Sequence, residues 1–540
     1  MPVLDWLNKG SAIRTASQTP YRLLKHDPEL SYGDPDSDNL LIQGDNLEAL
    51  KALIPLYAGQ VKCIYVDPPF NTKQAFEHYD DNLEHSIWLS LLYPRFELLR
   101  ELLSEDGTLF VHIDDSEVGY LTVMLDEIFG RKNRTHIVAF KQGSATGHKA
   151  INPGMVNTCN FVLSYAKNKE YWKPNTVYTG RERDSRYSQF IENYEDSYEQ
   201  WKVTPLLEAF SKSTGITKKN IKKHFGDSFE KELTAFVVSH SERVIRTARP
   251  DYNAVGEDVR RAIDASKSSP DRVHLHTRKS APNMYLKNGE RWIFYKEKLK
   301  NIDGVLVTGE PLTTLWADVL SNNLHNEGGV KFPKSKKPEA LLKRIIDLSS
   351  DKGDLVLDSF LGSGTTAAVA HKMNRRYIGI EMGDHAVTHC APRLQKVVDG
   401  EQGGISKAVE WQGGGGFRFY RLGETVYDEY GCLNQNIGFD TLAGHIWYNE
   451  IRKPVAPLPQ TNKTPLLGVH NGVAYYLLYN GILGDRRPDG GNVLTTPVLK
   501  SLPPFDGPKV IYGETSRLGE SRLAREQITF KQIPYDVKAR

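Results

Sequence analysis

A buried strand followed by a glycine-rich loop is the feature that most constrains the fold of this chain. Asp354–Asp358 is apolar between two acids, residues 359–366 read Ser-Phe-Leu-Gly-Ser-Gly-Thr-Thr, and Ala367–Met373 is typical of the start of a helix. This order binds nucleotides in open α/β sheets, because glycine lets a ligand approach the backbone and a helix N-terminus favours an anionic group. The feature therefore predicts a ligand at the loop, and the alternation of strands with helices in residues 41–170 and 339–400 predicts a parallel, doubly wound sheet.

A second short strand, Tyr377–Glu381, also ends in an acid. Its distance from the loop suits a carboxylate that holds two ribose hydroxyls. The loop is not a complete G-x-G-x-x-G, because Thr366 follows Thr365, and it is not a G-x-x-x-x-G-K-[ST]. A ribose-bearing ligand other than a dinucleotide or ATP is therefore favoured.

A tetrapeptide with two prolines lies much earlier in the chain. The apolar run Val61–Val66 ends in Asp67-Pro68-Pro69-Phe70. Proline fixes φ and restricts the residue before it, so a carboxylate, a carbonyl and an aromatic ring are held close together. Two acceptors and a ring suit the exocyclic amino group of a flipped base. A simple turn at a strand end is the alternative for this motif taken alone.

Together these motifs resemble those of bacterial β-group amino-methyltransferases, enzymes that methylate DNA with S-adenosyl-L-methionine (SAM). The resemblance rests on residues 67–72, on Gly44-Asp45-Asn46 and on residues 358–366, with the catalytic motif before the cofactor motif. It is strongest to the modification (Mod) subunits of type III restriction–modification systems. Further stretches that resemble this family are residues 104–130, 160–168, 332–333, 337–339 and 528–535.

The resemblance covers most of residues 20–400, is looser toward the C-terminus, and is weakest between about 171 and 310. Two positions depart from the family pattern, which commonly has Tyr at the position of Phe70 and Pro at that of Ser359. Phenylalanine keeps the stacking surface and loses only a hydroxyl, so we expect activity to survive.

The resemblance implies a site-specific methyltransferase acting on adenine N6. The residues expected to be catalytic are Asp67, Pro68, Pro69 and Phe70. The residues expected to bind the cofactor are Asp45, Asp358, Phe360, Gly362, Gly364, Thr365, Glu381 and Lys337. If Asp67 and the Pro68 carbonyl accept both N–H bonds of the adenine amino group, the nitrogen becomes more tetrahedral and its lone pair points at the sulfonium methyl. This reaction needs no covalent enzyme intermediate.

Three alternatives remain open from the sequence. Asp67 before the two prolines resembles adenine-N6 enzymes, whereas cytosine-N4 enzymes commonly carry Ser there, so cytosine N4 is the nearest alternative. The chain could instead serve mainly as a recognition subunit for a helicase–nuclease partner. RNA is a third possible substrate, although no RNP-type aromatic motif is present.

Charge is unevenly distributed along the chain. The whole chain carries +2, but residues 201–300 hold 21 Lys and Arg against 12 Asp and Glu, which leaves the remainder at −7. Because phosphate contacts need such cations, this segment suits target recognition. The candidate DNA-binding residues are Lys218, Lys219, Lys222, Lys223, Arg243, Arg246 and Arg249. A solvated helix face is the alternative for any single lysine.

Composition fits an intracellular enzyme of two to four domains. There is no apolar run of 18 residues and no signal-peptide layout, so we expect a cytoplasmic bacterial protein without a membrane segment. The four cysteines form no CxxC pair and no metal site is expected. His112, Asp114 and Asp115 could line the cleft, but a structural or dimer role is favoured.

The expected partners are double-stranded DNA, a second copy of the chain in a homodimer, and a restriction subunit. The expected domains follow the composition and the motifs. They are an N-terminal arm (1–40), a first catalytic segment (41–170), an inserted target-recognition domain (171–310), a second catalytic segment with the SAM loop (311–400) and a small C-terminal α/β domain (401–540).

Overall fold

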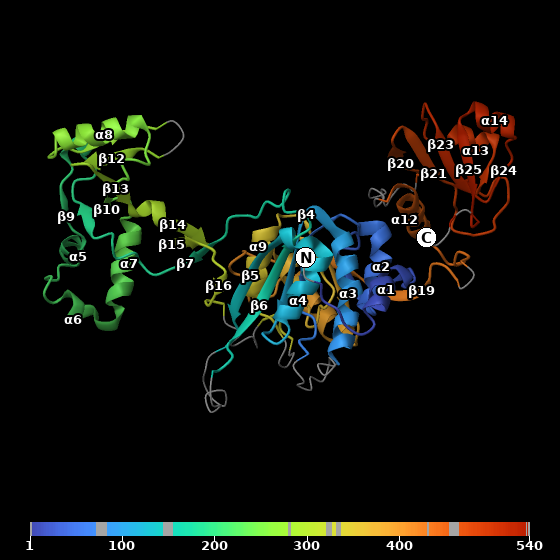
Figure 1. Cartoon of the computed structure of the whole chain (residues 1–540), viewed down its shortest axis with the longest axis horizontal. Helices are drawn as coiled ribbons and strands as arrows, with labels where there is room; N and C mark the ends of the chain where they lie inside the picture. Colours follow the sequence, from blue (N-terminus) through green and yellow to red (C-terminus); the bar gives the residue numbers. More distant parts are fainter. Residues whose placement is uncertain are drawn as a thin grey trace. The chain divides into compact units, whose positions relative to one another are not determined.

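The chain divides into two compact units, Met1–Asn175 with Thr313–Arg540 and Thr176–Leu312. Figure 1 presents the computed structural model of the whole chain. It describes residues 3–71, 84–143, 155–278, 282–319, 327–330, 336–428, 431–452, 464–535 and 537.

Ten strands of the described residues form one sheet in the first unit. In spatial order they are β1 (Arg22–Gly33), β19 (Gly416–Thr425), β2 (Leu40–Gln43), β18 (Arg376–Glu381), β17 (Leu355–Asp358), β3 (Val61–Val66), β4 (Leu103–Ile113), β6 (Cys159–Ala166), β5 (Arg134–Lys141) and β16 (Leu315–Trp316). Neighbours from β19 to β4 pair in parallel. Buried strands of this kind need cover on both faces of the sheet.

The direction of winding reverses between β3 and β17. From β3 the chain passes through α3 (His85–Leu102) to β4, and from β17 it passes through α10 (Thr365–Lys372) to β18 on the opposite side. Such a reversal opens a crevice at the carboxyl ends of the two strands. The doubly wound sheet predicted to be assembled from two distant segments is confirmed.

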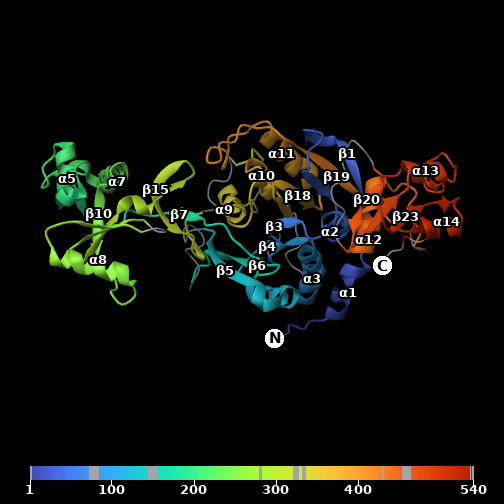
Figure 2. The same ribbon diagram turned by 90° about the horizontal axis from the view of Figure 1, so that it is seen from above.

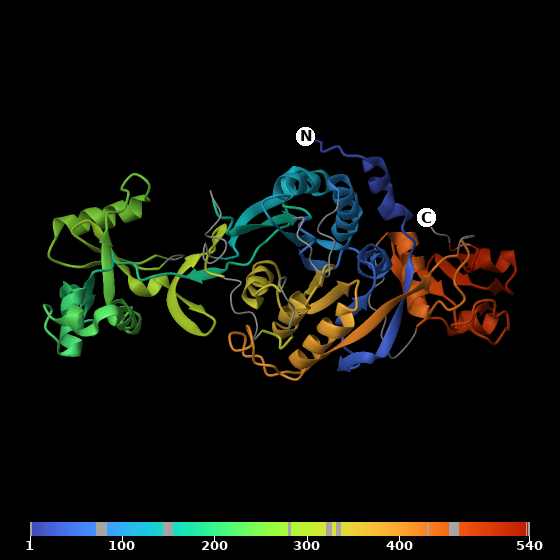
Figure 3. The same cartoon turned by 90° about the horizontal axis from the view of Figure 1, so that it is seen from below.

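Helices cover both faces of this sheet, as Figures 2 and 3 show. The helices α1 (Lys9–Gln18), α2 (Asn46–Tyr57), α3 and α4 (Val118–Leu125) pack in one large apolar core with the central strands. The helices α9 (Glu339–Ser349), α10 and α11 (Ala391–Val398) lie on the other face. Trp88, Phe96 and Leu99 of α3 are fully buried in this core.

Two chain segments differ from the expected organisation. Residues 22–33 are not a surface arm, because β1 pairs antiparallel with β19 at the edge of the large sheet. Its polar sequence follows from that edge position, and a register shift spans the part of β1 that contains Pro28, which suits an edge strand. β19 also belongs to the large sheet and not to a separate C-terminal domain.

The second unit contains a six-stranded and a three-stranded sheet of described residues. The larger sheet has β11 (His274–His276), β12 (Met284–Lys287), β13 (Glu290–Phe294), β10 (Val244–Ala248), β8 (Gln189–Ile191) and β9 (Val203–Pro205). The smaller sheet has β14 (Leu299–Ile302), β15 (Val305–Pro311) and β7 (Tyr178–Gly180). The helices are α5 (Leu206–Thr214), α6 (Ile221–Phe225), α7 (Phe229–Ser239) and α8 (Glu257–Ser268).

A smaller sheet lies near the C-terminal end of the chain. Its strands are β20 (Leu466–His470), β21 (Val473–Leu477), β23 (Lys509–Gly513) and β25 (Ile528–Gln532), of which the last three run parallel. The remaining elements are α12 (Phe439–Ile451), α13 (Thr496–Ser501), α14 (Glu520–Arg525) and the pair β22 (Val493–Leu494) with β24 (Thr515–Ser516). Within the described ranges, the helices are too short or too polar to span a membrane.

Candidate active site

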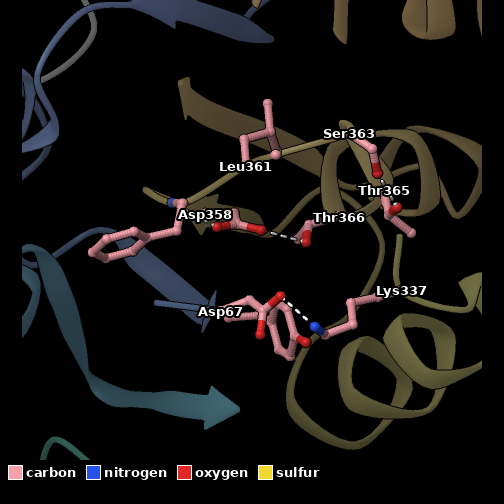
Figure 4. A pocket seen from close by; sticks show the side chains of 10 residues that line it. Asp67, Lys337, Asp358, Leu361, Ser363, Thr365 and Thr366 are labelled. Atoms are coloured by element: carbon pink, nitrogen blue, oxygen red, sulfur yellow. Dashed lines mark hydrogen bonds and ion pairs between the residues drawn. The ribbon is translucent and has the colours of Figure 1, made fainter. Parts of the chain in front are cut away.

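A pocket lies at the carboxyl ends of β3 and β17, where the winding of the sheet reverses (Figure 4). It combines the residue that follows β3, the end of β17 and the glycine loop. Its lining residues are Tyr65, Asp67, Lys337, Asp358, Phe360, Leu361, Gly362, Ser363, Thr365 and Thr366. The two motifs read from the sequence, 291 residues apart, therefore meet at one place.

Asp67 presents its carboxylate to this pocket, and the two oxygens of that carboxylate have different surroundings. Oδ2 lies 2.5 Å from Nζ of Lys337. Oδ1 is buried and has no hydrogen-bond partner among the residues that the structure describes. Burial raises the pKa of the Asp67 carboxyl, and the Lys337 ammonium opposes that shift. An unpaired buried acceptor costs free energy unless a ligand supplies a donor, so this oxygen marks a place for one.

The residues after Asp67 are held in place by their neighbours. The Pro69 carbonyl accepts a hydrogen bond of 2.8 Å from Nε1 of Trp88. Asn71 has a left-handed backbone (φ 57°), and its Nδ2 donates to Oε1 of Glu117 at 3.2 Å. With Pro68 and Pro69 fixing φ and these contacts at Pro69 and Asn71, the turn is stiff, as the sequence predicts.

The ring of Phe70 packs beside buried His112, at 5.6 Å between ring centroids. Nδ1 of His112 lies 3.0 Å from the hydroxyl of Tyr65 and Nε2 lies 3.1 Å from Nδ2 of Asn160. Burial lowers the pKa of His112 well below its usual range, and the charge of Lys337 adds to this effect. A neutral histidine with both nitrogens engaged is a structural support for the Phe70 ring.

Asp358 closes the opposite side of the pocket. Its Oδ1 accepts from the Phe360 amide at 2.9 Å, and its Oδ2 accepts from Oγ1 of Thr366 at 2.5 Å. Burial raises the pKa of Asp358 to about 7, although both hydrogen bonds favour the carboxylate. The group therefore changes charge near neutral pH.

The glycine loop needs its glycines for backbone conformation. Gly362 and Gly364 have φ of 56° and 79°, in the left-handed region that other residues rarely adopt. A Cβ on Gly364 would also lie 3.3 Å from Cα of Cys390. The Gly362 amide donates to Oε2 of Glu381 at 2.7 Å, so the acid at the end of β18 contacts the loop directly.

A network of buried ion pairs next to the glycine loop was not predicted from the sequence. Nη1 of Arg393 donates to Oγ1 of Thr365 at 2.7 Å, and its Nη2 donates to Oε1 of Glu339 at 2.7 Å. Nζ of Lys372 binds Oε2 of Glu339 at 2.8 Å, and the side chains in both ion pairs are 0% exposed. Burial by itself would raise the pKa of Glu339, but the two cations hold it below its usual value.

Asp45 lies beside the loop and not in the pocket lining. Its Oδ1 caps α2 by accepting from the Leu47 amide at 2.8 Å, and its Oδ2 pairs with Nη2 of Arg95 at 3.0 Å. The adjacent Asn46 donates to the Ser359 carbonyl at 2.8 Å. Asp45 therefore has a structural role at the start of α2, and its side chain is 38% exposed.

The seven basic residues predicted to bind DNA all belong to the second unit. Lys218, Lys219, Lys222, Lys223 and Arg249 are exposed, whereas Arg243 and Arg246 are half-buried. Nε of Arg243 donates to the Ile191 carbonyl at 3.0 Å, and the Arg246 guanidinium lies 5.4 Å from the centroid of the Tyr187 ring. Arg249 pairs with Glu290 at 3.3 Å. Of the seven candidates, the four lysines are thus the most accessible for contact with DNA phosphates.

Comparisons with known proteins place these motifs in a family. A family model described as DNA methylase matches residues 61–391. The chain is 37% identical, over 73% of its length, to a probable type III restriction–modification enzyme HindVI Mod subunit from Haemophilus influenzae. It is 29% identical, over 70% of its length, to the EcoPI Mod subunit from Escherichia phage P1.

A type II methyltransferase, M.EcaI from Enterobacter cloacae, is 27% identical over 76% of this chain and 81% of its own length. The matches to the two Mod subunits span 55% and 62% of those longer proteins. The resemblance to type III Mod subunits is confirmed by these identities. With the family model matching well over half of its residues, the chain belongs to the DNA methylase family.

Proposed function

We propose that this chain is a site-specific DNA methyltransferase that transfers a methyl group from SAM to N6 of a flipped adenine. We further propose that it acts as the modification subunit of a restriction–modification system, as the names of its relatives suggest. The observation that carries the proposal is Oδ1 of Asp67, which is buried, has no hydrogen-bond partner among the described residues, and lies beside the glycine loop where the winding of the sheet reverses.

In this proposal the residues after β3 hold the amino group of the target base. Oδ1 of Asp67 and the carbonyl of Pro68 accept its two N–H bonds, and Phe70 stacks on the base. Accepting both bonds turns the nitrogen lone pair away from the ring, and Oδ1 is positioned to take the proton that the nitrogen loses. Such positioning and hydrogen bonding supply most of the acceleration when the methyl donor is already activated.

The residues around the glycine loop fit SAM. A loop that a Cβ would crowd, a buried acid that titrates near neutral pH and an acid at the end of the next strand suit a cationic ligand with a ribose. When bound, SAM would supply an electrophilic methyl group, and the electron pair of the broken C–S bond would stay on sulfur. Phe360, Gly362, Gly364 and Thr365 would line its methionine part beside Asp358, Glu381 would hold the ribose hydroxyls, and Asp45 would contact the adenine.

The charge of Asp358 gives a testable pH dependence of SAM binding. Because its pKa is raised to about 7, the carboxylate is mostly protonated at pH 6 and mostly ionised at pH 8. Only the ionised form attracts a cation, so SAM affinity should increase up to about tenfold over this range. Calorimetric titrations at several pH values measure it. Asp358→Asn should bind weakly at all pH values, and Thr366→Val, which loses a hydrogen bond to the carboxylate, should shift the rise to higher pH. Wild-type affinity that is constant from pH 6 to 8 contradicts the assignment.

We propose that the second unit recognises the target sequence. Its exposed lysines at 218, 219, 222 and 223 supply cations for DNA phosphates. Replacing all four by Gln should weaken DNA binding and reduce the slope of log Kd against log salt by up to about 0.9 for each lost contact. Fluorescence anisotropy at several salt concentrations measures this slope.

A matched control removes the same charge from the first unit. Four of its exposed lysines are Lys132, Lys352, Lys407 and Lys500. Replacing these by Gln should leave the salt slope unchanged. Equal losses in the two quadruple variants would refute the recognition role of the second unit.

A homodimer and a restriction subunit are further parts of the proposal. The relatives named as Mod subunits belong to type III systems, which is what supports the restriction partner. Light scattering of the purified chain should give a mass near twice 61.0 kDa. Co-expression with a type III helicase–nuclease subunit should give a stable complex, and a chain that stays monomeric and unbound in both assays would remove these two partners.

Sequencing of native DNA molecules tests the reaction itself. A methylation-deficient host expressing the chain should gain N6-methyladenine in one short motif, and a host expressing Asp67→Ala should not. Modification on one strand of an asymmetric motif would agree with the type III relatives. N4-methylcytosine in the motif would move the assignment to cytosine, and methyl label found in RNA but not in DNA would overturn it.

A further inference from the structure

Lys337 contacts the tetrapeptide motif at two places. Its Nζ lies 2.5 Å from Oδ2 of Asp67 and 5.0 Å from the centroid of the Phe70 ring. Figure 4 shows its side chain pointing across the pocket toward Asp67. Its side chain is 14% exposed and that of Asp67 is 17% exposed, so water screens this ion pair only weakly. The Lys337 ammonium is thus positioned to influence the charge and orientation of the Asp67 carboxylate.

The backbone that carries Lys337 is anchored to the interior. Lys337 lies two residues before Glu339, the first residue of α9, whose carboxylate is fully buried between Arg393 and Lys372. The backbone of Lys337 is therefore held by the buried start of α9. A cation on a well-packed backbone orients a carboxylate more precisely than a cation on an exposed loop.

A buried carboxylate needs such a partner if it is to accept a hydrogen bond. Burial favours the protonated form, in which a carboxyl group donates through its hydroxyl and loses acceptor capacity. The other titratable groups near Asp67 are Tyr65 from β3, His112 from β4 and Asp358 from β17. Tyr65 and His112 stay neutral and Asp358 is an acid, so Lys337 is the cation that faces Asp67 among the described residues.

We propose that Lys337 is a positioning residue for methyl transfer: its ammonium binds Oδ2 of Asp67 and thereby leaves Oδ1 to accept from the amino group of the target base. This inference rests on the proposed function and assigns Lys337 to the acceptor carboxylate, in place of the cofactor-binding role that the family resemblance implies. It also gives Phe70 a cation beside its ring, which holds the ring in place for stacking.

Three variants test the role of Lys337. Lys337→Gln removes the charge, Lys337→Arg restores it, and Lys336→Gln removes a charge one position away. Lys336 is a matched control because its ammonium donates to the carbonyls of Glu327 and Val330 and not to the motif. Thermal unfolding of each variant establishes that it is folded.

The first measurement is the titration of Asp67 in the protein without cofactor or DNA. Selective ¹³C labelling of Asp carboxyl groups, with Asp67→Asn to identify the signal, gives its midpoint directly. Loss of an opposite charge in contact should raise the midpoint by about 1 to 3 pH units in Lys337→Gln. The midpoint should return toward the wild-type value in Lys337→Arg and stay unchanged in Lys336→Gln. An unchanged midpoint in Lys337→Gln overturns the proposal, whether or not the chain methylates DNA.

The second measurement separates the acceptor role from a cofactor role. At saturating SAM, the single-turnover rate of Lys337→Gln at neutral pH should fall at least about tenfold, with its acid limb moved to higher pH. The SAM dissociation constant should stay close to that of the wild type. A large loss of SAM affinity with an unchanged acid limb would return Lys337 to the cofactor site. Absence of methyl transfer by the wild-type chain would instead count against the proposed function.

Discussion

An Asp67→Asn variant is expected to lose methyl transfer by about 10³-fold or more, the effect of removing a hydrogen-bonding group from a reacting centre. Lys337 gives the reason for so large a loss. The amide oxygen of the substituted side chain would turn toward the ammonium that now binds Oδ2, so the NH2 group of the amide would face the amino group of the base. A donor would then meet a donor where an acceptor is needed.

Single-turnover transfer of labelled methyl groups to DNA measures this loss, and calorimetry with SAM should give nearly wild-type affinity for the same variant. Asp36→Asn, which changes an exposed carboxylate in the turn before β2, is a suitable control and should transfer methyl groups at the wild-type rate. If Asp67→Asn turns over within a few-fold of the wild type, Asp67 is not the acceptor.

A Glu339→Leu variant is expected to lose about 3 to 5 kcal/mol of stability, because it leaves the buried Arg393 without its carboxylate and leaves Lys372 with Glu401 as its only carboxylate partner among the described residues. Glu339 lies between Arg393 and Lys372, and each of these side chains is fully buried. Arg393 also donates to Thr365, so the loss should reach the glycine loop and weaken SAM binding. Urea unfolding followed by tryptophan fluorescence measures the change in stability.

The control for this prediction breaks an ion pair on the same helix at the surface. Asp318 pairs with Arg344 of α9 at 2.5 Å, but the Asp318 side chain is 53% exposed. Asp318→Asn should therefore cost less than about 1 kcal/mol. Equal effects of the two substitutions would contradict the view that burial of Glu339 makes its ion pairs important.

The meeting of Asp67 and Asp358 could be predicted because parallel strands place their carboxyl ends at one edge. Each acid ends an apolar run that can only be a central strand, and the glycine loop fixes which end carries the ligand. Nothing more than local sequence is needed for that argument. The same reasoning predicted the doubly wound sheet from two separate segments.

The contacts that support the site could not be predicted in the same way. Arg393 and Lys372 lie 54 and 33 residues from Glu339, and no local pattern marks any of the three as partners. The motif containing Lys337 was recognised, but its contact with Asp67 depends on how α9 packs against the sheet. β1 was hidden for another reason: an edge strand keeps polar residues, so its composition is that of a surface segment.

The position of β2 in the sheet has a consequence for folding during synthesis. β2 lies between β18 and β19, so both of its partners are made long after it, and Gln43 is 378 residues from Arg421 of β19, to which it is hydrogen-bonded. At about 5 to 20 residues per second, a ribosome needs about 20 to 75 s to cover that distance. The apolar strand Leu40–Gln43 must wait in a nascent chain that cannot yet bury it, and a chaperone that shields it would govern how much of the protein reaches the native state.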